Sequence, residues 1–328
     1  MTARWRWRFW AWPAELRHCG LLGMNRRNAD YILPNNRRKH YGLVDDKLRT
    51  KQICERHGIP VPRTHLVVER QGDVRHFEDL LGGREEFVVK PTQGSEGRGI
   101  VVVSGRVGEA WTTVGGEVIS PSEMQYHLSA ILAGLYSLGG RPDRVVIEER
   151  IQRHSAFAHV LVGGTPDIRV IVYRGLPVMA MIRLPTQLSK GRANLRQGAV
   201  AAGIELHSGR TVGGVWRSRM IDVHPDTQQP ITGFQVPDWA PLLQLSIRLA
   251  ERLELGYVGI DFVLDQHRGP VVLEANARPG LAIQLANRRG LLPRLEQIDA
   301  HLDARNPAPE PSGDSALPLD LLARLSTA

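Results

Sequence analysis

The segment from Phe87 to Val103 reads Phe-Val-Val-Lys-Pro-Thr-Gln-Gly-Ser-Glu-Gly-Arg-Gly-Ile-Val-Val-Val. Its apolar, mostly β-branched ends, 87–89 and 100–103, predict two strands joined by a glycine-rich turn. Glycine permits positive φ angles and a close approach of the backbone to a ligand, so that N–H groups can face phosphate oxygens. The segment therefore predicts a hairpin that covers an anionic ligand, with Lys90 at the end of its first strand.

Other phosphate-binding loops fit this segment less well. A Walker A loop and a dinucleotide-binding fingerprint both lead into a helix, whereas an apolar strand follows the glycines here. Protein kinases cover ATP with a strand-loop-strand, but they need a His-Arg-Asp and an Asp-Phe-Gly motif, and the sequence contains neither. An ordinary glycine-rich hairpin without a ligand is the alternative interpretation of the segment alone.

The composition is that of a globular protein. The chain has 328 residues, of which 42% are hydrophobic, enough for one large core or two of medium size. Two cysteines, Cys19 and Cys54, supply neither a disulfide framework nor a cysteine metal cluster, which favours a reducing compartment. No apolar run approaches the roughly 18 residues of a membrane-spanning helix, and no export signal is recognisable. These features predict a cytoplasmic protein.

The formal net charge of +8 comes mostly from arginine, since only five of the 42 cationic side chains are lysine. Such a balance suits nucleic acid or anionic small substrates. The arginines are spread along the chain, except in residues 4–12, Arg-Trp-Arg-Trp-Arg-Phe-Trp-Ala-Trp. This Trp/Arg-rich segment fits an anionic membrane surface, RNA or a partner protein, and it equally fits packing onto its own domain.

Residues 45–57 predict a helix, because acidic residues stand at the start and Gly58 and Pro60 follow the end. Lys47 falls in the first turn, where a cation opposes the helix dipole. A solvated lysine is the ordinary interpretation of such a residue.

Residues 144–151 predict a buried strand that ends in the charged residues Glu148, Glu149 and Arg150. A strand end with a free backbone edge suits a flat adenine ring, with a carboxylate nearby for ribose hydroxyls. A charged strand terminus at the surface is the alternative.

Residues 167–173 and 178–183 predict a hairpin that turns at Arg174-Gly175. Its strands carry Asp167, Arg169 and Arg183. The polar loop that follows, 190–198, contains three cations, which either face solvent or face a phosphoryl group.

Two strands, 258–264 and 270–276, flank a five-residue turn. The antiparallel hairpin that they predict carries three oxygen-bearing side chains: Asp261, Glu274 and Asn276. Buried without partners, such groups would cost several kcal/mol, and oxygen ligands favour Mg²⁺ or Mn²⁺ over zinc. The hairpin therefore predicts a metal site; the alternative is that one of the carboxylates pairs with an arginine such as Arg278.

The remaining pattern predicts a helix over 122–138 and another that begins at Asp238, with an inner leucine stripe, and ends at Gly256. After about residue 300 the composition changes to that of a Pro-rich linker and a weakly docked or mobile tail.

These motifs stand in the order and approximate spacing of the ATP-grasp superfamily. The chain most closely resembles the branch of ribosomal-protein glutamate ligases, and within it the α-L-glutamate ligase-like proteins, over residues 24–299. The motifs that carry the resemblance are Lys90 with its glycine loop, Asp46-Lys47-Leu48-Arg49, Glu148-Glu149, Asp167-Ile168-Arg169, Asn194-Leu195, Asp261 and Glu274-Ala275-Asn276.

The resemblance implies an α+β protein with the ATP-grasp fold, in which two α/β subdomains grip ATP between antiparallel sheets. It places a Trp/Arg-rich and reduced pre-ATP-grasp segment at 1–41, an N-terminal subdomain with the glycine-rich lid at 42–150, a C-terminal subdomain with the metal site at 151–299, and a Pro-rich linker and tail at 300–328.

The resemblance also implies roles for individual residues. Lys47, Lys90, Gly94, Ser95, Gly97 and Gly99 would hold or cover the ATP phosphates, and Glu149 with the backbone at Arg150 would bind the ribose and adenine. Asp167, Arg192 and Asn194 would line the site near the γ-phosphate, with Arg192 and Lys190 stabilising the transferred group. Glu148 and Arg169 would also belong to the ATP-binding residues. Asp261, Glu274 and Asn276 would bind two Mg²⁺ ions, with Mn²⁺ as a substitute.

The implied activity is ATP-dependent ligation of a small carboxylate, such as an amino acid or peptide, to an amine. Where the glutamate ligases continue Asn-Leu with His-Arg-Gly-Gly, this chain has Arg196-Gln197-Gly198-Ala199, which leaves the carboxylate and the amine open. The alternatives are a nucleotide-binding module that works through a protein or membrane partner, and a nucleic-acid-binding protein.

Overall fold

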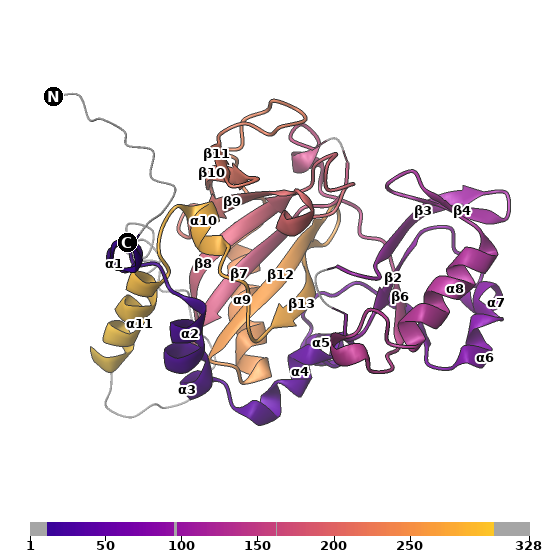
Figure 1. The fold of residues 1–328 in the computed structure, drawn as a ribbon, viewed down its shortest axis with the longest axis horizontal. Helices are drawn as coiled ribbons and strands as arrows, with labels where there is room; N and C mark the ends of the chain where they lie inside the picture. Colours follow the sequence, from indigo (N-terminus) through magenta and orange to yellow (C-terminus); the bar gives the residue numbers. More distant parts are fainter. Residues whose placement is uncertain (1–11, 95–96, 162, 305–328) are drawn as a thin grey trace.

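The computed structural model describes residues 12–94, 97–161 and 163–304. Within them the chain forms two antiparallel sheets, a small one of six strands and a large one of seven, that lie side by side in Figure 1. Each sheet has its own hydrophobic core. The Trp/Arg-rich residues 4–11, Ser95 and residues 305–328 of the tail lie outside the described residues.

The small sheet has the strand order β1-β6-β2-β3-β4-β5, and α6, α7 and α8 pack against it (Figure 1). Its core centres on Phe77, Phe87 and Trp111, whose rings meet edge to face with centroids 5.9 to 6.1 Å apart. The elements of this part are β1 Thr64–Val68, α6 Gln71–Val74, α7 Phe77–Leu81, β2 Phe87–Pro91, β3 Val101–Val107, β4 Ala110–Thr113, β5 Val118–Ile119, α8 Pro121–Leu132, η3 Leu138–Gly140 and β6 Val145–Glu148.

The large sheet has the order β11-β10-β9-β8-β7-β12-β13. Arg174 and Gly175 join β7 to β8 with φ angles of 48° and 82°, the left-handed conformation that a tight hairpin turn requires. The elements here are η4 Ser155–Phe157, β7 Asp167–Tyr173, β8 Leu176–Leu184, η5 Leu195–Gln197, β9 Val200–Ile204, β10 Thr211–Trp216, β11 Arg219–Ile221, α9 Trp239–Leu253, β12 Tyr257–Asp265, β13 Gly269–Asn276, α10 Ile283–Asn287 and α11 Leu292–Ala304.

The N-terminal residues are folded onto the large sheet. Asn36 donates from its amide to the carbonyl of Tyr257 at 2.7 Å and accepts from the Tyr257 N–H at 2.8 Å. The elements of this segment are α1 Pro13–His18, α2 Met24–Arg26, the π-helix η1 Arg27–Ile32, α3 Leu33–Asn35, η2 Arg38–His40, α4 Gly42–Asp45 and α5 Lys47–Arg56.

Helix α5 is the element that joins the two parts. The sequence places it with residues 42–150, but its buried Cys54, together with Val44 and Ile59, packs in the core of the large sheet. The core of the small sheet begins only at Val68. In Figure 1, α5 lies between β13 and β6. The apolar face of α5 therefore packs in the core of the large sheet.

Two predicted helices differ from those in the structure. The helix expected over 122–138 begins after the N-cap Ser120, whose side chain forms a capping box with Glu123, and ends at Leu132. Gly134 follows the C-cap Ala133 with a φ of 85°, a left-handed conformation that ends the helix. Asp238 precedes α9 as predicted, but its side chain makes no capping hydrogen bond.

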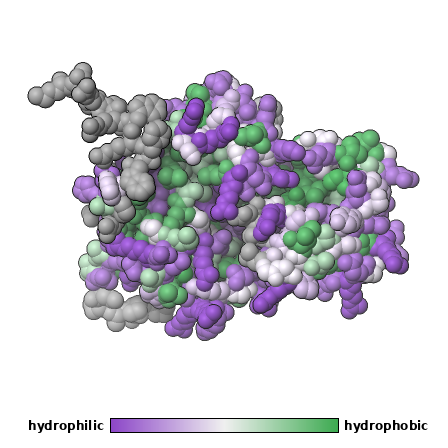
Figure 2. All heavy atoms as spheres, in the orientation of Figure 1, coloured by the Kyte–Doolittle hydropathy of each residue, from purple (hydrophilic) through white to green (hydrophobic). Residues whose placement is uncertain are grey.

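The face drawn in Figure 2 mixes polar and apolar residues, with apolar surface over β3 and β4. Val107 on β3 is 60% exposed. Among the described helices, none combines the length and the apolar character that a bilayer-crossing segment needs.

Candidate functional site

The glycine-rich turn between β2 and β3 is anchored at both ends. Gly94 forms a β-bridge with Ser137. Gly99 has a φ of 74°, and a Cβ there would lie 2.7 Å from the Tyr136 ring. The Nε2 atom of His127 lies 3.0 Å from the Gly99 carbonyl oxygen. The two strands pair as expected, with Phe87 opposite Val103, so the predicted hairpin is confirmed.

A buried carboxylate, not predicted from the sequence, supports the start of this turn. Asp143 accepts hydrogen bonds from the Ser137 hydroxyl at 2.7 Å and the Gln93 N–H at 3.0 Å, and also from the Thr92 hydroxyl. These donors are neutral, so the carboxylate is solvated by the protein in place of water. Asp143 therefore holds in place residues 92–93, which lead into the glycine turn.

Lys47 is the first residue of α5, after the N-cap Asp46, whose side chain accepts from the Leu48 N–H. Its ammonium group donates to the carbonyl of Gly94 at 2.6 Å and lies 3.8 Å from the Glu274 carboxylate. One lysine thus contacts the glycine turn and the large sheet together.

Lys90 lies in a buried ion cluster rather than in solvent. Its ammonium group is 2.5 Å from Oε2 of Glu148, and the ammonium group of Lys51 is 2.7 Å from Oε1 of the same carboxylate. Burial acts to raise the pKa of Glu148, but the charges of Lys90 and Lys51 outweigh it and hold that pKa below its usual range. Lys51 is not among the site residues predicted from the sequence, although it lies four residues after Lys47 and therefore on the same face of the helix.

The end of β6, which the sequence predicts to hold adenine, has both of its backbone edges paired up to and including Glu148. This residue pairs with Thr64 on one side and Val88 on the other, because β6 is an interior strand of the sheet. Free backbone can begin only beyond it. The side chains there contact surface residues: Oε1 of Glu149 accepts from Nη1 of Arg268 at 2.7 Å, and Arg150 lies 2.8 Å from Glu86.

Four charged side chains meet on one face of the large sheet. Arg169 donates to both oxygens of Asp261 at 2.6 Å, and Arg183 donates to Asp261 at 2.8 Å and also to Asp167. The alternative in which a carboxylate of this hairpin pairs with arginine is therefore realised by Asp261, with Arg169 and Arg183 rather than Arg278. Arg278 instead stacks over the ring of Tyr41 at 5.2 Å.

The two carboxylates of this cluster differ in their acidity. Burial, together with the negative charge of Asp261, raises the pKa of Asp167 to about 7, although Arg183 opposes the shift. Asp261 is more deeply buried, 2% exposed against 9% for Asp167, yet the charges of Arg169 and Arg183 hold its pKa well below the usual range. Asp261 is thus the permanent anion of the cluster.

Glu274 and Asn276 lie beside this cluster on β13. The register pairs Asp261 with Glu274 and Gly259 with Asn276, which confirms the predicted proximity of the two carboxylates. The Glu274 side chain is 37% exposed, and Oδ1 of Asn276 accepts from the Arg278 N–H at 2.8 Å. The residues the structure describes contain no cluster of three or more His, Cys, Asp or Glu suited to a metal.

The loop after β8 begins at the end of the sheet that carries Arg183. Lys190 is exposed, and its ammonium group lies 3.3 Å from Glu117 near the β4–β5 turn. Arg192 is exposed as well. Oδ1 of Asn194 accepts from the Arg196 N–H at 2.9 Å, which caps the short helix η5. The cations therefore lie in a loop that reaches toward the small sheet.

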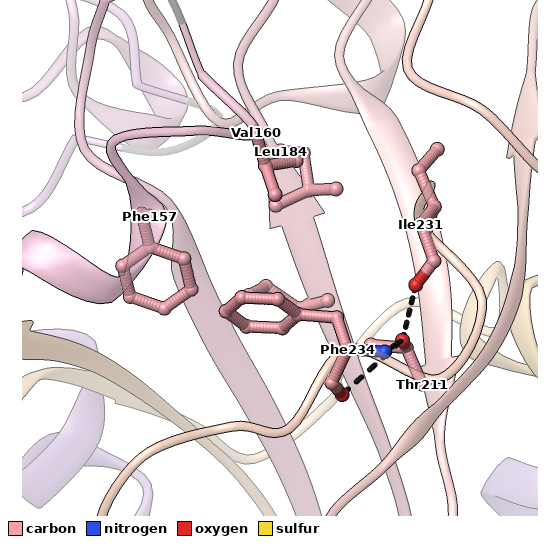
Figure 3. A pocket seen from close by; sticks show the side chains of 7 residues that line it. Phe157, Val160, Leu184, Thr211, Ile231 and Phe234 are labelled. Carbon is pink, nitrogen blue, oxygen red and sulfur yellow. Dashed lines mark hydrogen bonds between the residues drawn. The ribbon is translucent and has the colours of Figure 1, made fainter. Parts of the chain in front are cut away.

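A small apolar pocket lies on the opposite side of the large sheet (Figure 3). Its lining includes Ile182 and Leu184, which alternate along β8 with Arg183 and so face the other way. The Thr211 hydroxyl at its edge donates to the Ile231 carbonyl (Figure 3). The pocket has no charged lining residue and is separate from the charged face.

Comparison with known families identifies this arrangement. Residues 26–300 match the family described as sugar-transfer associated ATP-grasp. The chain belongs to this family. The sugar-transfer associated ATP-grasp match covers both sheets and α5, so the predicted ATP-grasp fold is confirmed.

Two curated relatives of this ATP-grasp chain are a probable α-L-glutamate ligase of Legionella pneumophila (strain Corby) and the ribosomal protein bS6–L-glutamate ligase of Shigella boydii serotype 4 (strain Sb227). Each is 24% identical over 268 residues, which cover 82% of this chain and 64% of the relative. The chain thus spans a little under two thirds of the length of these relatives.

Among solved structures, the ATP-grasp chain is similar to D-alanine–D-alanine ligase from Bacillus anthracis, with 15% identity, a TM-score of 0.45, and coverage of 81% of this chain and 69% of the other. It is also similar to the D-cycloserine synthetase DcsG, with 16% identity, a TM-score of 0.43, and coverage of 80% and 71%.

Proposed function

We propose that the chain is an ATP-dependent carboxylate–amine ligase. The observation that carries the proposal is the position of Lys47, whose ammonium group contacts both Gly94 of the glycine turn and Glu274 of the large sheet. A triphosphate with its metal needs cations and backbone N–H groups on one side and metal-binding oxygens on the other. Membership of an ATP-grasp family and relatives named as ligases support the same conclusion.

In this proposal Lys47 and Lys90 neutralise the phosphates, and the turn containing Gly94, Gly97 and Gly99 covers them. Glu149 and the backbone of Arg150 hold ribose and adenine beyond the paired end of β6. Closure of the turn excludes water that would otherwise hydrolyse a reactive intermediate.

The donor set on β13 fits Mg²⁺. Glu274 offers a half-exposed carboxylate, and Asn276 offers an amide oxygen on the same face. Asp261 fits less directly, because both of its oxygens already accept from arginine. We therefore assign Glu274 and Asn276 as the principal ligands. When bound, the ion would reduce the negative charge that an attacking carboxylate meets at the γ-phosphate.

The reaction takes two displacements. A carboxylate oxygen of the substrate attacks the γ-phosphorus and ADP leaves, which gives an acyl phosphate. The amine then attacks the carbonyl carbon, loses a proton, and expels phosphate to leave an amide. Arg192 and Lys190 are placed in the loop that would face the transferred group and stabilise its charge. Asp167 and Arg169, with Asn194, would line the site near the γ-phosphate.

The substrates are proposed only by class: a small carboxylate, such as an amino acid or peptide, and an amine. The relatives are named for glutamate, but Arg196-Gln197-Gly198-Ala199 differs from the sequence of the glutamate ligases in that loop. The family description also associates the fold with sugar transfer, so amines and carboxylates on sugars belong in the panel.

The experiment is ATP- and Mg²⁺-dependent hydroxamate formation, with ADP release followed in parallel. Hydroxylamine serves as the amine, and amino acids, small peptides and sugar acids serve as the carboxylates. Hydroxamate formed with one carboxylate by the wild type and lost in Lys90→Ala supports the proposal. ATP binding without ADP release across the whole panel would favour a nucleotide-binding module that does not ligate.

A further inference from the structure

Lys51 lies in a buried ion cluster with Glu148 and Lys90, and the proposed reaction gives it no role. Lys51 and Lys90 are each 6% exposed and Glu148 is 4% exposed. The two ammonium groups bind different oxygens of one carboxylate, at 2.7 and 2.5 Å. A buried carboxylate held from both sides in this way has little freedom to move, and neither has a lysine bound to it.

The two lysines come from different parts of the fold. Lys51 is on α5, which packs in the core of the large sheet, whereas Glu148 and Lys90 are on β6 and β2 of the small sheet. The Lys51–Glu148 pair therefore crosses the junction between the two sheets. Lys47, one helical turn earlier on α5, faces the glycine turn and Glu274.

The charges of the cluster do not cancel. Two ammonium groups share one carboxylate, which leaves a formal excess of one positive charge. Glu55, which also acts on Lys51, is exposed. Burial lowers the pKa of Lys51 below its usual range, although the charge of Glu148 opposes the shift. An uncompensated buried cation is costly, so the cluster is suited to receive an anion.

We infer that Lys51 is a positioning residue for nucleotide binding: through Glu148 it holds the ammonium group of Lys90 in place for a phosphate group. This inference rests on the proposed function. Lys51 acts through its neighbours, so its contribution should depend on the presence of Lys90. An effect on folding alone would not have that dependence.

The test is a double-mutant cycle on ADP binding by isothermal titration calorimetry, with Lys51→Met, Lys90→Met and the double variant. Lys51→Met is expected to weaken ADP binding about tenfold in the wild-type background and no more than about twofold in the Lys90→Met background. Lys39→Met, an exposed lysine on η2, is the matched control and should bind ADP as the wild type does.

Equal losses in the two backgrounds, or no loss with Lys51→Met, would overturn the inference. If Lys51→Met does not fold, Lys51→Gln goes through the same cycle, because its amide still donates to Glu148 without a charge. Wild-type protein that binds no ADP would contradict the proposed function itself. Wild-type binding that Lys51 does not influence would contradict only the role of Lys51.

Discussion

The ammonium group of Lys47 lies 3.8 Å from the carboxylate of Glu274. The same group donates to the carbonyl of Gly94 at 2.6 Å, so one side chain links the glycine turn, α5 and β13. The ammonium group of Lys47 has two partners, a carboxylate and a carbonyl, and a bound nucleotide with its metal would compete for these contacts. Phosphate would compete for the ammonium group and a metal ion for Glu274. The contacts of Lys47 should therefore change when ligand binds.

We expect Lys47→Met to weaken ATP binding about tenfold or more, because a charge-assisted contact to phosphate is lost. Titration calorimetry at fixed Mg²⁺ measures the change. Lys39→Met is again the control, since Lys39 is exposed and outside the site. Unchanged affinity in Lys47→Met would remove Lys47 from the phosphate site.

Glu274→Ala should abolish ATP turnover while the protein remains folded. The carboxylate is 37% exposed and its ion pair with Lys47 is long, so its removal should cost no more than about 1 kcal/mol of stability. ADP release and thermal unfolding report the two effects separately. Full turnover in a folded Glu274→Ala variant would show that the metal assignment is wrong.

Gly99→Ala should impair nucleotide binding, because the residue has a φ of 74° and a Cβ would lie 2.7 Å from the Tyr136 ring. Strain in the left-handed region costs about 1–3 kcal/mol. Gly72→Ala on α6 is the matched control, since nothing lies within 4 Å of its Cβ position, and it should bind ATP normally. Equal affinity in the two variants would contradict a conformational requirement at Gly99.

Glu148 should make the free energy of unfolding decrease as the pH falls below about 4.5. Its pKa lies below the ordinary 4.5 in the folded protein, so the unfolded chain takes up the proton first as the pH falls. The stability that Glu148 contributes is present above about pH 4.5 and is lost as the pH falls through the folded pKa. Urea unfolding between pH 3 and 7 should be less steeply pH-dependent in Glu148→Gln than in the wild type; identical dependence would contradict the ion cluster.

The local patterns in the sequence were sufficient for the hairpins. The glycines flanked by β-branched residues at 87–103 and the strands carrying Asp261 and Glu274 were placed correctly, because strand pairing follows from alternation and turn chemistry. The prediction extends α8 past its end at Leu132, although Gly134, directly after the C-cap Ala133 and with a φ of 85°, is a local signal for that end.

Long-range ion pairs account for most of what the sequence did not predict. Lys51 and Glu148 are 97 residues apart, and Arg169 and Asp261 are 92 apart. A single sequence contains no signal for which of many arginines a buried aspartate will bind. For the same reason, the apolar face of α5 does not reveal in the sequence which of the two cores receives it.

The most direct test of the ligase reaction follows an oxygen atom. The carboxylate identified by the hydroxamate panel is labelled with ¹⁸O and turned over with ATP, Mg²⁺ and the amine, and the released phosphate is analysed by mass spectrometry. Since the attacking carboxylate oxygen leaves with phosphate, the account predicts one ¹⁸O atom in each phosphate formed. Phosphate whose new oxygen comes only from water would show that the chain hydrolyses ATP without activating a carboxylate, and would contradict the account.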